Sequence, residues 1–167
     1  MFNKRKYIII PILFIIFCFT SCFGGSLSAP EKAAVKYLEA YFEKEIDDLI
    51  DLISDEYLNS LMYYSESNTV EIYKEVLDNT LTDMKGDYSI EIIDTYEFAP
   101  EVHDRNRYID SDYLLGRDTT IIYADVHIKE KKLFKDNEYT KTFEIYVVED
   151  EGEYIIGYVH EHTFLFG

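Results

Sequence analysis

The spacing of the hydrophobic residues changes once along this chain, and that change restricts the possible folds more than any other feature. From Ala34 to Met84, apolar residues recur at intervals of three and four, which is the pattern of amphipathic helices. From Asp87 onward, apolar and polar residues alternate, which is the pattern of strands with one buried face. Helices followed by strands predict an α+β fold, in which N-terminal helices pack on a curved antiparallel sheet.

The first helical stretch carries a start signal. Ser28 can cap a helix, Pro30 fits in its first turn, and Glu31 is placed to complete a capping box. The stretch is expected to bend within residues 43–45 and to continue to Ile53. The sequence therefore predicts an opening pair of helices.

Two further helices are expected before the pattern changes. Residues 55–63 predict a short helix, and residues 70–84 carry the most regular amphipathic pattern in the chain. Asn68 and Glu71 match a capping box for this last helix, and Gly86 is expected to end it. Its apolar stripe is expected to cover the sheet.

Four strands are expected in the second half of the chain, namely residues 87–98, 119–134, 139–149 and 153–164. Asp136-Asn137 and Glu151-Gly152 are expected to form two-residue turns between the last three. These turns predict the cross-strand pairs Val126 with Val147, Ile128 with Ile145, Val147 with Ile156, Ile145 with Tyr158, and Phe143 with His160. All of these residues would lie on one apolar face of a meander.

The N-terminus has the layout of a secretory signal peptide. Lys4, Arg5 and Lys6 precede an apolar run, and small residues lead into Cys22. The end of this stretch resembles a bacterial lipobox, which implies that Cys22 carries acyl chains such as palmitate after cleavage before it. The chain then divides into a signal peptide at residues 1–21, a lipidated cysteine and tether at residues 22–29, and a single α+β domain at residues 30–167.

This N-terminus predicts an address outside the cytoplasm. The lipoprotein would be anchored in the cell membrane or the outer membrane and would face outside the cytoplasm, because the basic end of the signal stays inside. An uncleaved anchor or plain secretion is the alternative. The apolar run from Tyr7 to Phe19 is shorter than the roughly 20 residues that a spanning helix needs.

The acidic composition narrows the range of partners. The formal net charge is −17, and nucleic acid binding needs a basic face, so no nucleic acid partner is expected. The sequence contains no Ser-His-Asp, Cys-His or glycine-rich phosphate motif, and no cofactor is expected. The expected partners are the membrane, through the lipid on Cys22, and a small molecule or another protein.

Three stretches resemble small bacterial lipoproteins with a nuclear-transport-factor-2-like domain, also called cystatin-like. Residues 30–54 resemble the opening helical pair of that family, residues 119–148 its long central hairpin, and residues 148–156 its closing strand. The family usually has Trp in the closing strand where this chain has Tyr154. The resemblance implies a cone-shaped fold with a helix-lined cavity, and it implies no catalytic residues.

Four histidines raise the question of a metal site. His160 and His162 are two residues apart, which places both imidazoles on one face of a strand at a spacing that metal ligands use. The predicted register puts His160 on the apolar face and His127 on the opposite face, and His103 lies in an irregular stretch. These residues would not converge, so no metal is expected.

Residues 99–118 form the least regular stretch. They contain every arginine that follows the signal peptide, namely Arg105, Arg107 and Arg117. A calcium-loop spacing begins at Asp104 but is broken at Tyr108. In an acidic protein, these arginines either recognise a carboxylate or phosphate ligand or pair with neighbouring acids, and pairing is the simpler expectation.

The leading functional hypothesis is a non-enzymatic, membrane-anchored module that binds a ligand or another protein. We expect a ligand pocket on the concave face, lined by Phe143, Tyr158 and His160 and assisted by Arg105 or Arg107. The alternative is a small cone-fold enzyme that uses a pocket Asp, His or Tyr as a general acid or base. A carboxylate with a raised pKa in an apolar pocket would favour the enzyme, whereas a cavity filled by side chains would favour the binding module.

Overall fold

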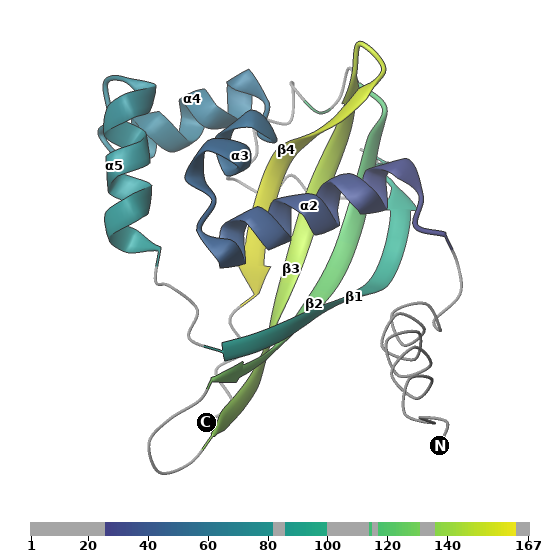
Figure 1. The fold of residues 1–167 in the computed structure, drawn as a ribbon. Helices are drawn as coiled ribbons and strands as arrows, with labels where there is room; N and C mark the ends of the chain where they lie inside the picture. Colours follow the sequence, from purple (N-terminus) through teal and green to yellow (C-terminus); the bar gives the residue numbers. More distant parts are fainter. Residues whose placement is uncertain (1–25, 82–85, 100–113, 115–116, 131–135, 163–167) are drawn as a thin grey trace, which may run out of the picture.

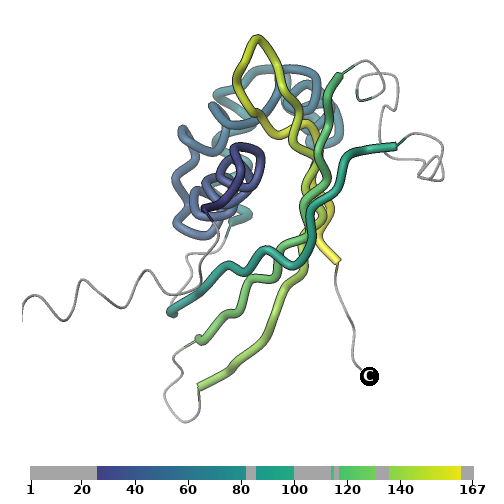
Figure 2. Tube along the Cα trace, turned by 90° about the vertical axis from the view of Figure 1, so that its right-hand side faces the viewer, coloured from purple at the N-terminus to yellow at the C-terminus, as the bar shows by residue number. Residues whose placement is uncertain are grey.

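The computed structural model describes residues 26–81, 86–99, 114, 117–130 and 136–162, which form an α+β unit (Figure 1). Its helices are α2 (Ala29–Glu43), α3 (Ile46–Asp51), α4 (Asp55–Tyr64) and α5 (Val70–Thr80). Its strands are β1 (Gly86–Glu97), β2 (Thr119–Glu130), β3 (Asn137–Asp150) and β4 (Glu153–His162). The strands form a curved antiparallel sheet in the order β1-β2-β3-β4, with α2 on its concave side (Figure 2). The predicted α+β class is confirmed.

Helix α2 begins and ends where the sequence predicts. The Ser28 N–H donates to Glu31 Oε2 at 2.7 Å, and Ser28 Oγ accepts from the Glu31 N–H at 3.4 Å, which completes the capping box. The chain leaves α2 through Lys44, whose φ of 58° is left-handed. Helix α2 crosses the concave face and contacts all four strands (Figure 1). It is therefore the helix that covers the sheet.

Helix α5 differs from the prediction in its ends and in its position. Its N-cap is Thr69 rather than Asn68, and it ends at Thr80. Gly86 does not end this helix but opens β1, where a Cβ would collide with the carbonyl oxygen of Lys129. Helix α5 packs against α3 instead of lying across the sheet. Its apolar stripe therefore extends the core beside the sheet.

The main core lies between α2 and the face of the sheet that α2 covers, called the covered face below. Phe42 of α2 meets Phe143 of β3 edge to face, with ring centroids 5.8 Å apart. Leu38 of α2 and Ile145 of β3 are completely buried in the same layer. Each fully buried side chain of this size contributes about 1.5–3 kcal/mol to the free energy of folding, so this layer dominates the stability.

The pairing of β2 with β3 is displaced from the predicted register. Residues 131–136 connect the strands, so Asp136-Asn137 is not a two-residue turn. Both predicted pairs are wrong: Val126 lies opposite Lys141 and Ile128 lies opposite Tyr139. The displacement is six residues, an even number, and side chains alternate between the two faces. Val126 and Ile128 therefore still point into the main core, as predicted.

The hairpin between β3 and β4 starts in the predicted register and then departs from it. Glu151 and Gly152 form the turn with φ of 52° and 89°, and Val147 pairs with Ile156 as predicted. Beyond that point, Ile145 lies opposite Val159 instead of Tyr158, and Phe143 lies opposite Glu161 instead of His160. One extra residue in β4 is the cause.

Bulges in the two edge strands move their ends to the uncovered face of the sheet, the face away from α2. In β4, Gly157 is the extra residue, so Tyr158 and His160 lie on the uncovered face. In β1, Ile93 is the extra residue, so Tyr96 also lies there. The pairing of β2 with β3 has no such shift. The two bulges therefore gather side chains from all four strands on the uncovered face.

A second, smaller core forms on the uncovered face. It contains the buried residues Leu114, Ile121, Tyr146 and Val148. Leu114 belongs to the irregular stretch 99–118 and is only 1% exposed, so this part of the stretch is structural. A Cβ at Gly157 would lie 3.1 Å from Leu114 Cδ2 and closer still to a methyl of Val148, so the second core leaves no room for a side chain there.

Two groups of predicted residues lie outside the ranges that the structure describes. The signal peptide and Cys22 fall within residues 1–25, and His103, Arg105 and Arg107 fall within residues 100–113. Among the helices that the structure describes, none is long and apolar enough to cross a membrane.

Candidate functional site

The predicted pocket residues do not come together. Phe143 is 2% exposed in the main core, where Tyr41 and Phe42 contact its ring at centroid distances of 6.1 and 5.8 Å. Tyr158 and His160 lie on the uncovered face, on the other side of the sheet. The pocket of Phe143, Tyr158 and His160 is therefore wrong, because the bulge at Gly157 reverses the faces of β4 beyond it.

Side chains fill the space between α2 and the sheet at the place where a pocket was expected. Tyr37 is 7% exposed, and its burial raises the pKa of its hydroxyl well above the ordinary value. The Tyr57 hydroxyl donates to the Val159 carbonyl oxygen at 3.3 Å, and burial likewise raises its pKa. Neutral phenols and packed rings occupy this layer, which is the environment of a folded core.

A polar cluster occupies the uncovered face instead. We call it the Glu144 cluster, and it consists of Tyr96, Tyr123, Glu144, Tyr146 and His162. Tyr123 of β2 lies directly opposite Glu144 of β3, and His162 lies near the end of β4. The cluster thus draws on all four strands.

Glu144 is the centre of this cluster. Its Oε1 accepts a hydrogen bond from the Tyr146 hydroxyl at 2.7 Å, and its Oε2 lies 3.1 Å from His162 Nε2. Because an ionised carboxylate only accepts, His162 Nε2 carries the proton of that bond. The Tyr123 hydroxyl also donates to Glu144, and Tyr96 hydrogen-bonds to Tyr123. The Glu144 side chain keeps only 13% of its surface exposed.

The charge state of Glu144 follows from its neighbours. Burial raises the pKa of this carboxyl, but the hydrogen bonds from Tyr146, Tyr123 and His162 together outweigh burial and leave the pKa lowered. Burial and the nearby carboxylate raise the pKa of the Tyr123 and Tyr146 hydroxyls. At neutral pH the site therefore holds a negative carboxylate among neutral phenols, which suits an acceptor of hydrogen bonds or positive charge.

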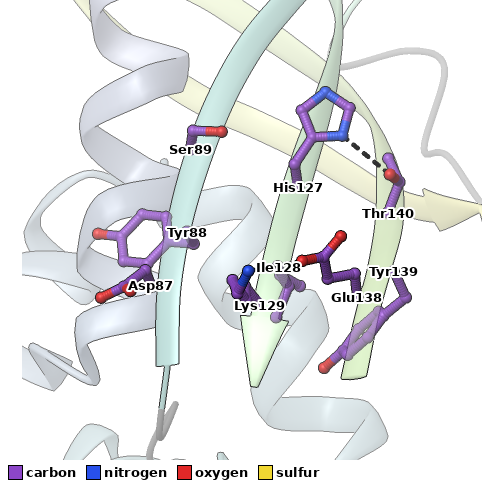
Figure 3. A pocket seen from close by; sticks show the side chains of 9 residues that line it. All are labelled: Asp87, Tyr88, Ser89, His127, Ile128, Lys129, Glu138, Tyr139 and Thr140. Carbon is purple, nitrogen blue, oxygen red and sulfur yellow. Dashed lines mark hydrogen bonds and ion pairs between the residues drawn. The ribbon is translucent and has the colours of Figure 1, made fainter. Parts of the chain in front are cut away.

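A separate hollow lies at the other end of the strands (Figure 3). It has a volume of about 500 Å³ and is lined by Asp87, Tyr88, Ser89, His127, Ile128, Lys129, Glu138, Tyr139 and Thr140. His127 Nδ1 lies 2.9 Å from Thr140 Oγ1, and its Nε2 lies 3.3 Å from Glu91 Oε2. Lys129 donates to Glu138 at 2.7 Å. The polar side chains of His127, Thr140, Lys129 and Glu138 in this hollow are therefore paired with other protein groups.

The histidines do not form a metal site in the part of the chain that the structure describes. No three His, Cys, Asp or Glu side chains there are grouped to hold an ion. His127 and His160 do share the uncovered face, contrary to the predicted register. They are nevertheless separated along the strands, because their partners on β3 are Thr140 and Glu144.

Arg117 pairs with acids, as the sequence suggests for the arginines of this stretch. Its guanidinium lies 2.7 Å from Asp150 and 3.6 Å from Glu56. It therefore ties the start of β2 to the end of β3 and to α4. This arginine serves to hold elements together.

The Glu144 cluster was not predicted from the sequence. Glu144 and Tyr146 are two residues apart on one strand, and Tyr158, His160 and His162 occupy alternate positions on the next strand. This spacing indicates that each set of polar and aromatic side chains can share one face of its strand. The sequence does not reveal that both sets share a face, because that depends on the bulge at Gly157.

Comparisons with known proteins add no functional assignment. No protein-family model matches the chain, and no curated protein matches it in sequence.

Proposed function

We propose that this chain is an extracytoplasmic lipoprotein, held at the membrane by acyl groups on Cys22, whose domain binds a ligand and has no catalytic activity of its own. The curved sheet with α2 on its concave side supports a place among the nuclear-transport-factor-2-like domains. The basic and apolar N-terminus that ends in Cys22 supports the anchor.

The observation that carries the binding role is the Glu144 cluster. A carboxylate that is 13% exposed and hydrogen-bonded by two tyrosines and a histidine is held in place before any ligand arrives. A general base must take up a proton near neutral pH, and a lowered pKa disfavours this. The environment of Glu144 therefore supports recognition over acid–base catalysis.

The packed side chains between α2 and the sheet also favour a binding module over a cone-fold enzyme. The contacts of Phe143 with Tyr41 and Phe42 occupy the space in which a cone-fold enzyme would hold its substrate. The uncovered face is thus the better candidate for ligand binding.

The test uses the full-length lipidated protein extracted from membranes. A panel of small polar and charged molecules is screened by thermal shift, because a ligand that binds only the folded state raises the melting temperature. We expect at least one stabilising ligand, recovered unchanged by mass spectrometry after incubation. Conversion of that ligand to a product by the wild-type protein would contradict the non-enzymatic role, and the absence of any stabilising ligand would contradict the binding role.

A further inference from the structure

Within the described residues, the ionisable partner of the Glu144 carboxylate is His162, 3.1 Å away, and not a lysine or an arginine. The hydrogen-bond donors to its carboxylate are Tyr123, Tyr146 and His162, and among the described residues no lysine or arginine forms an ion pair with it. Other carboxylates on the same face do have such partners, as Glu138 does in Lys129 at 2.7 Å. A mostly buried carboxylate without a lysine or arginine leaves a local excess of negative charge.

Aromatic rings surround this carboxylate. The rings of Tyr123 and His162, on the strands at either side of β3, are nearly parallel, with centroids 6.3 Å apart and planes at 21°. The Tyr96 ring lies next to that of Tyr123, with ring centroids 5.4 Å apart, and Tyr96 is 37% exposed. Aromatic rings from β1, β2 and β4 therefore lie beside Glu144, and Tyr96 is an exposed ring at the edge of this group.

We propose that the Glu144 cluster binds a small organic cation of the quaternary ammonium type. Such a cation has no N–H to donate, and it is stabilised by aromatic ring faces together with a nearby negative charge. A carboxylate accepts about four hydrogen bonds. Three of these positions on Glu144 are already filled by protein donors, which suits a ligand that brings charge without donors.

The alternative ligands fit this site less well. A hard metal ion needs several oxygen ligands, and the described residues provide no group of three candidate ligands. An anion would be repelled by Glu144 and by the net charge of −17. This inference rests on the proposed binding role and specifies the class of ligand.

The experiment compares choline with its neutral isostere 3,3-dimethylbutan-1-ol. Each is titrated by calorimetry into the full-length lipidated protein in dodecyl maltoside, a detergent without an ammonium group. We expect choline to bind at least tenfold more tightly than the isostere, which has the same shape but no charge. A third titration with phosphocholine separates a free cation from a lipid headgroup as the source, because its phosphate is expected to weaken binding to this acidic site.

Matched variants locate the site. Glu144→Gln keeps the size of the side chain and removes its charge, and it is expected to weaken choline binding at least tenfold. Glu138→Gln on the same strand is the control and is expected to leave choline binding unchanged. Should Glu144→Gln fail to fold, Tyr96→Ala removes one exposed ring of the Glu144 cluster and is expected to weaken choline binding severalfold.

Four results would overturn the inference, and the last two also decide whether the proposed binding role stands. Equal affinity for choline and the isostere would show that charge is not recognised, and an unchanged choline affinity in Glu144→Gln and Tyr96→Ala would place the site elsewhere. If choline fails to bind but another ligand stabilises the wild type and not Tyr96→Ala, the cation inference fails while the binding role stands. If the wild type binds neither choline nor any ligand of the thermal-shift panel, both fail.

Discussion

Leu114 offers the sharpest test of how the stretch 99–118 contributes to the fold. Its side chain is 1% exposed and packs with Ile121, Tyr146 and Val148. Leu114→Ala removes the buried methyl groups and leaves a cavity, and substitutions of this kind cost about 2–5 kcal/mol. Because the second core is small and can partly collapse, we expect a loss of about 2–4 kcal/mol in the free energy of unfolding.

This loss is measurable in two ways. Urea unfolding followed by circular dichroism should show a lower midpoint with an unchanged slope. For a chain of this size, about 2–4 °C of melting temperature is lost per kcal/mol, so we expect a decrease of about 5–15 °C.

The control is Leu27→Ala, because Leu27 is 37% exposed. This change is expected to alter the free energy of unfolding by less than about 0.5 kcal/mol. If Leu114→Ala behaves like this control, Leu114 does not support the second core, and the assignment of a structural role to this stretch is refuted.

Three further substitutions test the anchor, the charge of Glu144 and the bulge in β4. Cys22→Ala should leave an unlipidated, unprocessed N-terminus in mass spectrometry, whereas Cys18→Ala, the change at the other cysteine, should still be lipidated and found with membranes. The pKa of Glu144 is lowered in the folded state, so ionisation of this carboxyl stabilises the fold. This contribution to the free energy of unfolding is present above the ordinary pKa of 4.5 and is lost as the pH falls through the folded-state pKa. Glu144→Gln should therefore reduce stability at pH 7, and in urea titrations its difference from the wild type should shrink as the pH falls below 4.5; a constant difference at all pH values would contradict this reasoning. Gly157→Ala should cost about 1–3 kcal/mol because its Cβ overlaps a methyl of Val148, and Val148→Ala should recover part of that loss in the double variant; no recovery would mean that the overlap is not the cause.

The ends of the helices show which features can be predicted from residues close together in the sequence. The capping box of Ser28 and Glu31 and the break after Glu43 involve residues within a few positions of each other, so the sequence predicts both correctly. The end of α5 is different, because Gly86 is needed for its close approach to Lys129 of β2, not as a helix stop. A glycine that serves a long-range contact carries the same local signal as one that ends a helix.

The sheet shows what a period of two can and cannot determine. The alternation in β2 and β3 correctly predicts that Val126 and Ile145 share the covered face, although the pairing between the strands is displaced by six residues. Any even displacement preserves the faces, so the pattern alone does not select among such registers. The length of the connection at residues 131–136 makes that choice.

The bulges at Ile93 and Gly157 decide the location of the candidate site. The doublet Ile92-Ile93 and a glycine inside a strand are compatible with bulges, but neither determines on its own that the register shifts there. One extra residue reverses every side chain beyond it, so Tyr96 and His162 join Glu144 on the uncovered face. By itself, the sequence determined the α+β class, the start of α2 and the two faces of the central strands, because those depend on local capping and on spacing within one segment. Only the tertiary structure placed Glu144 among tyrosines and a histidine, because that arrangement depends on how the bulged edge strands pair with their neighbours.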